Sequence, residues 1–209
     1  GLYCGLTKPV DLGVNDIDIN NPASRYHGID IKGLIGHNTH VLFIDTKSPE
    51  MMDGHSRVNY GEVETIDRLL ERFEKSSTFQ RYLSKFSKDE DKQIGIISFY
   101  GKQIKQLRSI AFKHPSLPIR VSTVDRFQGM ERNIVIVSMV RSNIIQSSKA
   151  QKPDRKRYPE YGYPMQKSLG FAQSPNRLNV ALSRAKRLLI IVGNRDLFSQ
   201  LEIYQRLFM

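Results

Sequence analysis

Runs rich in apolar and β-branched residues alternate with amphipathic stretches along most of this chain. Runs that are apolar almost throughout are typical of strands buried on both faces, and they predict strands at 40–45, 94–100, 119–124, 133–140 and 187–193. Between them, apolar residues recur at every third or fourth position, a helical spacing. This spacing predicts helices at 59–75, 77–86, 102–112, 175–186 and 195–207. Strands separated by helices predict right-handed βαβ units and a mostly parallel sheet, hence an α/β fold.

The start of the first helix carries a capping signal. Asn59 suits the N-cap position, and Glu62 falls three residues later, as in a capping box. Capping alone explains both residues, so neither is assigned a ligand. The helix then presents one apolar stripe to the sheet, made by Val63, Ile66, Leu69, Leu70 and Phe73.

The predicted helix 175–186 carries two arginines. Its apolar stripe consists of Leu178, Ala181, Leu182 and Ala185. Arg177 and Arg184 are two helical turns apart, so we expect both on one face, roughly 10.5 Å apart along the axis.

Polar residues gather where the predicted strands end, at 98–103, 122–131 and 141–143. Ligands of open parallel sheets bind beyond the carboxyl ends of the strands, and we therefore expect these clusters at that edge. In the middle cluster, Gly129 permits a tight turn beside Thr123, Asp125, Gln128 and Glu131. Such hydroxyl, amide and carboxylate groups suit ribose and phosphate contacts, although they would equally stabilise a loop internally.

The net charge of the chain narrows the classes of molecule that it is expected to bind. The chain of 209 residues has a formal net charge of +11 and a pI of about 9.8, which is typical of a surface that meets phosphates. The alternative is an acidic neighbouring segment that has been removed, since the missing initiator Met suggests a piece of a longer protein. The single Cys4 fits a reducing compartment. With no long apolar run or signal peptide, we expect an intracellular protein, cytoplasmic or nuclear, that does not enter a membrane.

A basic, proline-containing stretch interrupts the pattern at 144–169. Its cations precede three tyrosines, Tyr158, Tyr161 and Tyr163. Basic residues near aromatics are able to track a single strand through phosphate attraction and base stacking. A solvated insertion would show the same composition. The residues we assign to strand contact here are Lys152, Arg155, Lys156 and Arg157, with Lys149 in the same cluster.

Three stretches resemble motifs of one enzyme family. "VSTVDRFQGMERNIVIVSMVRSN" and "GFAQSPNRLNVALSRAKRLLIIVGN" are similar to motifs V and VI of superfamily 1 helicases, nearest to the Upf-type and senataxin-like group. "QIGIISFYGKQIKQL" is similar to motif IV, with its Tyr100 and Gln103, and "LYCGL" faintly resembles the opening of the second motor domain.

The resemblance implies a RecA-like, P-loop NTPase-type three-layer sandwich at 41–209, preceded by an irregular lead-in at 1–40 from the preceding domain. The chain has no G-x-x-x-x-G-K-[ST], no metal-binding carboxylate motif and no "QYR" stretch. We therefore expect the second RecA-like domain alone. ATP and Mg²⁺ would be held mainly by the first RecA-like domain of the same parent chain, and this chain alone is expected to be inactive.

The resemblance also implies residue roles. Arg184 matches the arginine finger, which bridges charge that spreads over the phosphoryl oxygens during transfer. Glu131 matches a residue near the ribose and phosphates of the nucleotide. The other positions that match cleft-lining residues are Gln128, Gly129, Arg177 and Asn179; for Arg177 we slightly favour a salt-bridging brace. The positions that match contacts to the nucleic-acid backbone are Ser122, Thr123 and Tyr100.

Together with the resemblance, these observations predict one half of an ATP-dependent, 5′-to-3′-type helicase acting on single strands. The strand is DNA or RNA, because contacts to the backbone carry no base information and do not distinguish the two. Two alternatives stay open: a nucleic-acid-binding scaffold from a parent without ATPase activity, and a helicase fused to a nuclease. We predict no metal site, since His37 and His40 lack a second ligand pair with zinc spacing.

Overall fold

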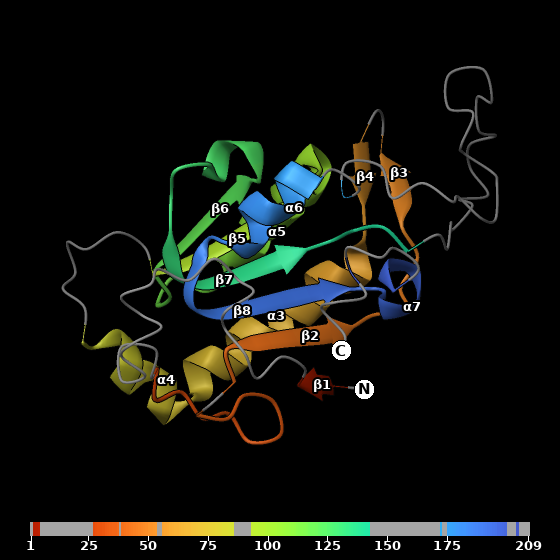
Figure 1. Cartoon of the computed structure of the whole chain (residues 1–209). Coiled ribbons are helices and arrows are strands. Elements are labelled where there is room, and N and C mark those ends of the chain that lie inside the picture. Colours follow the sequence, from red (N-terminus) through yellow and green to blue (C-terminus); the bar gives the residue numbers. More distant parts are fainter. Residues whose placement is uncertain are drawn as a thin grey trace, which may run out of the picture.

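A six-stranded sheet forms the centre of the protein (Figure 1). The computed structural model describes residues 2–4, 27–37, 39–53, 56–85, 93–142, 172, 175–199 and 204. The strand order is β1-β2-β8-β7-β5-β6. The bounds are β1 Leu2–Cys4, β2 Val41–Asp45, β5 Ile94–Ser98, β6 Ile119–Thr123, β7 Arg132–Ser138 and β8 Ala185–Gly193. β1 pairs antiparallel with β2, whereas every other neighbouring pair is parallel.

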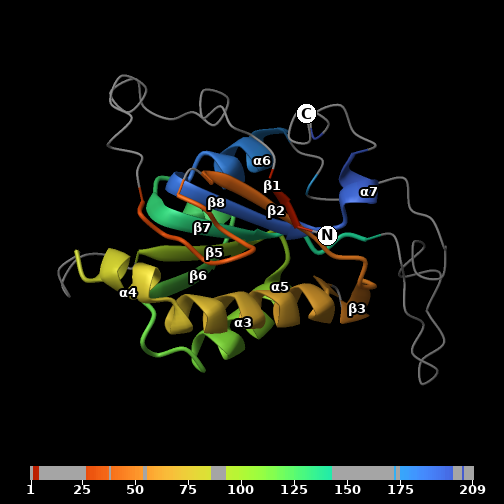
Figure 2. The same cartoon turned by 90° about the horizontal axis from the view of Figure 1, so that it is seen from below.

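Helices cover both faces of this sheet. On one face lie α3 Tyr60–Lys75, α4 Ser77–Leu83 and α5 Gly101–Ala111, and on the other lies α6 Pro175–Leu182 (Figure 2). The short α7, Arg195–Phe198, follows β8. Among the described helices, none is both long and apolar enough to cross a membrane. The three-layer, mostly parallel arrangement confirms the predicted RecA-like α/β fold.

Each face of the sheet has its own apolar core. Ile96, Ile136 and Ile190 pack toward α3 and α5, where they meet Ile66 and Leu107. Their neighbours along the same strands point the other way, and Val135, Val137, Leu189 and Ile191 pack with Leu178 and Ala181 of α6. The strands are therefore buried on both faces, as their uninterrupted apolar sequence predicts.

Several boundaries differ from those the pattern predicts. α6 ends at Leu182, and Ala185 begins β8, so the predicted helix 175–186 is wrong in its last turn. Ala185 pairs with Arg132 of β7 in the sheet. Residues 2–4, inside the stretch predicted to be irregular, form β1. Of the predicted helix 195–207, the described part contains α7 and the helical residue Tyr204.

A small hairpin stands at the end of the sheet toward which the parallel strands point (Figure 1). It consists of β3 Met51–Asp53 and β4 Ser56–Val58, paired antiparallel. The apolar pattern did not reveal it, although Asp53-Gly54 is a recognised hairpin-turn signal.

Candidate functional site

The predicted site residues fall into two groups at opposite ends of the parallel strands. We call the end where these strands finish the carboxyl edge of the sheet, and the end where they begin the amino edge. β6 ends at Thr123, and β7, which is parallel to it through β5, begins at Arg132. The connection between them, which includes the 3₁₀ turn η2 at Asp125–Phe127, must therefore return to the amino edge. The expectation that all of 122–131 lies at the carboxyl edge is wrong, because only its first residues do.

The amino edge brings Glu131 and Arg184 together. The backbone N–H of Arg132 donates to the carbonyl of Arg184 at 3.0 Å, which fixes the start of β7 against the turn before β8. The Glu131 carboxylate lies 3.5 Å from Lys186 Nζ, and both side chains are half exposed. Gln128 and Gly129 are exposed in the approach to this edge, and Gly129 takes a φ of 79° that favours glycine.

The Arg184 side chain folds back onto the end of α6. Its Nε donates to the carbonyl of Val180 at 3.0 Å, and its Nη2 donates to Ser183 Oγ at 3.0 Å. Because α6 ends before Arg184, this residue and Arg177 do not share a helix face, contrary to the sequence prediction. The guanidinium instead satisfies one of the carbonyls that the helix end leaves without an intrahelical partner.

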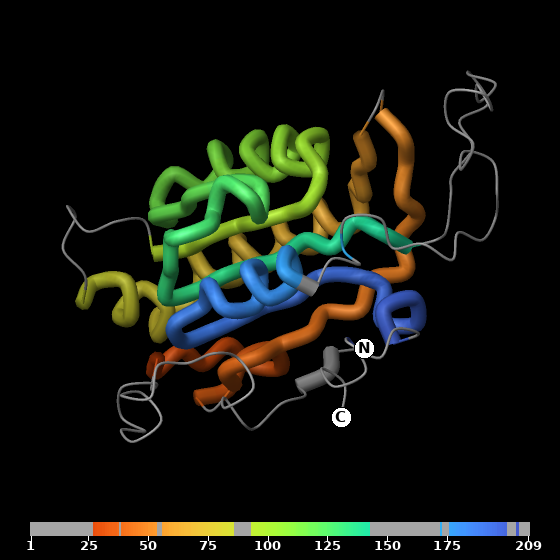
Figure 3. The backbone as a smooth tube through the Cα atoms, turned by 45° about the horizontal axis from the view of Figure 1, so that its top comes forward, coloured from red at the N-terminus to blue at the C-terminus, as the bar shows by residue number. Residues whose placement is uncertain are grey.

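Arg177 contacts a carboxylate. Its Nε and Nη2 donate to the two oxygens of Asp125 at 3.0 and 3.2 Å. The pair joins α6, which lies across the strands in Figure 3, to η2. This two-point geometry is that of a brace between the two elements. Asn179, on the same helix, is exposed.

The carboxyl edge holds the residues predicted to meet a nucleic-acid backbone. Thr123 is half exposed, whereas Ser122 is buried and Tyr100 is only 6% exposed. Burial raises the pKa of the Tyr100 hydroxyl, and the positive charge of nearby Arg141 opposes that rise. In this arrangement Tyr100 presents almost no ring surface to a base, so Thr123 is the most accessible of the three.

A buried polar network underlies this edge, and Glu62 is its centre. Ser138 Oγ donates to Glu62 Oε2 at 2.6 Å, and the N–H of Val140 donates to both carboxyl oxygens at 2.9 Å. Burial raises the pKa of Glu62 to about 8, although these hydrogen bonds favour the charged form and oppose the rise. The predicted capping box is only half formed. The Asn59 side chain accepts the N–H of Glu62, but the Glu62 carboxyl does not return to Asn59.

Gln103 takes the place that the capping box assigned to Glu62. Its Oε1 accepts the N–H of Asn59 at 2.9 Å, and its Nε2 donates to the Asn59 carbonyl at 3.2 Å and to Ser138 Oγ at 2.8 Å. Asn59 Nδ2 in turn donates to the carbonyl of Val140 at 3.1 Å. Both sides of Val140 are thus held, and Val140 is the one described non-glycine residue with a positive φ, 69°.

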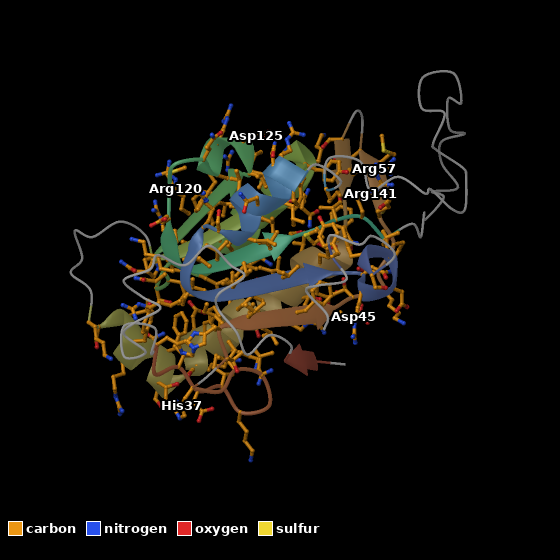
Figure 4. The ribbon with its side chains drawn as sticks, viewed as in Figure 1. His37, Asp45, Arg57, Arg120, Asp125 and Arg141 are labelled. Carbon is orange, nitrogen blue, oxygen red and sulfur yellow. The ribbon has the colours of Figure 1, made fainter. Side chains whose placement is uncertain are left out.

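A second buried cluster attaches the hairpin to the sheet. The fully buried Glu50 accepts from Arg57 Nη1 at 2.6 Å and from Arg141 Nε at 2.9 Å. Figure 4 shows Arg57 and Arg141 near each other beside the hairpin. Ser142 reinforces the contact, since its N–H donates to Glu50 Oε2 at 2.8 Å and its Oγ accepts the N–H of Glu50 at 2.9 Å. Sequence reasoning missed this cluster because Arg141 and Ser142, which join Glu50 and Arg57 to the sheet through Glu50, lie about 90 residues away in the sequence.

Other predicted residues contribute no further geometry. Lys152, Arg155, Lys156 and Arg157 lie outside the described residues. His37 lies 3.4 Å from Asp30, and His40 Nδ1 contacts the carbonyl of Arg187 at 3.1 Å. Within the described ranges, no group of three or more His, Cys, Asp or Glu side chains is arranged to hold a metal ion.

Comparison with known proteins decides the family. The AAA domain family matches residues 18–196, which is most of the chain. This chain belongs to that family, as an Upf-type helicase domain of superfamily 1. The predicted membership of the Upf-type group of superfamily 1 helicases is thereby confirmed.

Curated relatives of this helicase domain carry helicase names. It is 36% identical over 164 residues to "Putative helicase MOV-10" of Gallus gallus, and the matched region covers 75% of this chain and 14% of that protein. It is 38% identical over 115 residues to "Probable RNA helicase armi" of Drosophila melanogaster, covering 55% and 8%. It is 31% identical over 152 residues to "DNA polymerase alpha-associated DNA helicase A" of Saccharomyces cerevisiae, covering 72% and 17%. The chain thus spans less than a fifth of these relatives.

Proposed function

We propose that this chain is the second RecA-like domain of an ATP-dependent helicase, with nucleotide contacts at the amino edge of its sheet and strand contacts at the carboxyl edge. The observation that carries the proposal is the backbone pairing at the starts of β7 and β8, which places Glu131, beside Arg132, next to the turn that holds Arg184. These two residues come from different motifs, and the sheet brings both to a single accessible edge.

In this proposal, Arg184 is the arginine finger. When the first RecA-like domain presents Mg²⁺ and ATP, the guanidinium leaves Val180 and Ser183 and contacts the phosphoryl group in transfer. Its planar, permanently charged fork stabilises the charge that spreads over the phosphoryl oxygens. Glu131 contacts the nucleotide near its ribose and phosphates. Mg²⁺ would be held mainly by the other domain, since Glu131 lies beside a lysine and the described residues contain no group of carboxylates arranged to hold a metal ion.

The carboxyl edge contacts the backbone of a single strand through Thr123 and neighbouring residues, and the basic stretch 144–169 adds phosphate contacts. Support comes from the net charge of +11. The names of the relatives include both an RNA helicase and a DNA helicase. The proposed substrate is therefore a single-stranded nucleic acid of either kind.

The test replaces Arg184 in the polypeptide that joins this chain to its P-loop domain. Because the finger acts in the transition state, Arg184→Ala should lower strand-stimulated ATP turnover by about 10³-fold or more while nucleotide affinity changes little. Arg184→Lys should rescue little, because an ammonium lacks the planar fork. Arg108→Ala, at an exposed position of α5, is the matched control.

Turnover in Arg184→Ala within about threefold of wild type would make Arg184 a structural residue that caps α6, since genuine fingers contribute far more. A wild-type protein that binds strands without turning over ATP would favour the scaffold alternative.

A further inference from the structure

A lysine at the carboxyl edge is paired with a carboxylate of the hairpin. Lys102, in the first turn of α5, places its Nζ 3.1 Å from Asp53 Oδ1, at the end of β3. The two side chains are 40% and 44% exposed, so solvent reaches both. The N–H of Lys102 also donates to Ser56 Oγ at 3.2 Å, so hairpin and helix meet at two points.

The pair lies beside the proposed strand contacts. Ser98, the last residue of β5, pairs with Thr123 of β6, and α5 begins shortly after Ser98. Lys102 and Thr123 therefore sit at the same edge of the sheet. The preceding residue is open to solvent, because Gly101 is exposed and a Cβ added there would meet no atom within 4 Å.

Asp53 offers Lys102 the groups that a phosphate would offer. A carboxylate and a phosphodiester each present negatively charged oxygen acceptors to an ammonium. Glu50 and Arg57 hold the base of the hairpin in the buried interior, independently of Asp53. Asp53 is thus able to release Lys102 without detaching the hairpin.

We propose that Lys102 binds a phosphate of the single strand and that Asp53 competes with that phosphate for the lysine. The inference rests on the proposed function, since it places Lys102 on the same strand-binding edge. The hairpin then acts as a partial cover that weakens strand binding, and the strand displaces the Asp53 carboxylate when it binds.

Replacing the Asp53 carboxylate by a phosphate requires little free energy, because exposed ion pairs contribute little to stability. Removing the competitor should therefore raise strand affinity only about two- to fivefold. Losing the lysine should lower affinity by a similar factor and reduce the magnitude of the salt slope by about 0.7, the value for one phosphate on a single strand.

The experiment measures fluorescence anisotropy of labelled oligothymidylate and oligouridylate, each about 12 nucleotides long, with this chain across a salt series. The variants are Asp53→Asn, Lys102→Ser and the double substitution. Glu71→Gln is the control for Asp53→Asn, since Glu71 lies 3.9 Å from Lys75 in an exposed pair on α3. Lys105→Ser is the control for Lys102→Ser, being exposed one turn along α5. Thermal unfolding confirms that each variant folds.

We expect Asp53→Asn to tighten binding more than Glu71→Gln does, Lys102→Ser to weaken binding more than Lys105→Ser does, and Asp53→Asn to lose its excess effect when Lys102 is serine. Effects equal to those of the controls, in wild-type chain that binds strands, would overturn this inference and leave the proposed function intact. Absence of salt-sensitive binding by the wild type would overturn both this inference and the proposed strand contacts.

Discussion

Glu62 shows how far a single residue can be understood from sequence. Its position after Asn59 predicts a helix cap, and that is correct for the Asn59 side chain. The role of the carboxyl was not predictable, because Ser138 and Val140 lie 76 and 78 residues away along the chain. A local pattern contains no record of such partners. Arg184 and Glu131, by contrast, were assigned to the site from their motifs, and that assignment stays a prediction; the contact between Arg184 and Val180 was not foreseen.

Replacing Glu62 by glutamine should change the pH dependence of folding stability. Its pKa is about 8 in the folded protein and near 4.5 ordinarily, so the folded state binds the proton more tightly. The free energy of unfolding should therefore fall as pH rises from about 5 to 8, by an order of a few kcal/mol from this group, and level off above pH 8. Glu62→Gln should remove that fall, because the amide does not ionise.

Urea unfolding at several values between pH 5 and 9 measures this effect. The informative quantity is the difference between wild type and variant at each pH, which cancels the other titrating groups. For the control Glu71→Gln, in an exposed pair, the difference in unfolding free energy from wild type should not change with pH. Parallel pH profiles for wild type and Glu62→Gln would show that burial does not raise the pKa of Glu62.

At the scale of elements, the five parallel strands and the helices that cover them were predictable, but β1, the hairpin and the boundary after α6 were not. The stripe of Leu178, Ala181 and Ala185 continues the helical spacing, but the sheet takes Ala185 into β8, where it pairs with Arg132. Tertiary pairing thus overrides local propensity. The β3–β4 hairpin escaped prediction because its strands are too short to show a period.

His114 joins α3 to the segment between α5 and β6. Its buried imidazole contacts Glu74 through Nδ1 at 2.8 Å and Asp67 through Nε2 at 2.9 Å. Burial alone would lower the pKa of His114, but the hydrogen bonds and charges of the two carboxylates outweigh it and raise the pKa above its ordinary 6.5. The imidazolium therefore stabilises the fold fully below pH 6.5, and this contribution is lost as pH rises through the folded pKa.

We expect His114→Gln to lower the free energy of unfolding by about 2 kcal/mol at pH 6, the scale of a hydrogen bond to a charged group. The difference from wild type should shrink as pH rises through the folded pKa, toward pH 9, because the wild-type imidazole then loses its proton. Chemical unfolding at the two pH values measures it, with His37→Gln, in a half-exposed pair, as the control. A loss of equal size at both values would show that packing, and not charge, is responsible.

For the whole molecule, the order of strands and helices was enough to predict an α/β fold with a mostly parallel sheet, and the family resemblance added the three-layer RecA-like arrangement. It was not enough to assign the edges. The stretch 122–131 reads as a single polar cluster in the sequence. It nevertheless begins at the carboxyl edge and ends at the amino edge, because β7 must start where β5 and β8 start. Only the pairing of the strands determines which of its residues lie at the carboxyl edge and which lie at the amino edge.

The chain alone should not hydrolyse ATP. It lacks a P-loop and paired metal-binding carboxylates, so Arg184 has no positioned Mg²⁺–phosphate group to contact. The measurement is magnesium-dependent phosphate release across gel-filtration fractions of the purified chain. Release that follows the protein peak, and persists in Arg184→Ala, would point to a contaminating enzyme. Release that follows the peak and disappears in Arg184→Ala would show that the chain holds ATP by itself.

Strand β7 has a mechanical consequence. It runs from Arg132, whose N–H is bonded to Arg184, to Ser138, whose hydroxyl is bonded to Glu62, a span of about 20 Å. From Ile134 to Ser138, parallel strands flank it on both sides and packed cores cover both faces, so this part has little freedom to bend, whereas the pairing with β8 shifts register between Arg132 and Ile134. We therefore expect Ile134–Ser138 to move as one rigid unit, so that a displacement of this part of β7 also displaces Ser138 and its contact with Glu62.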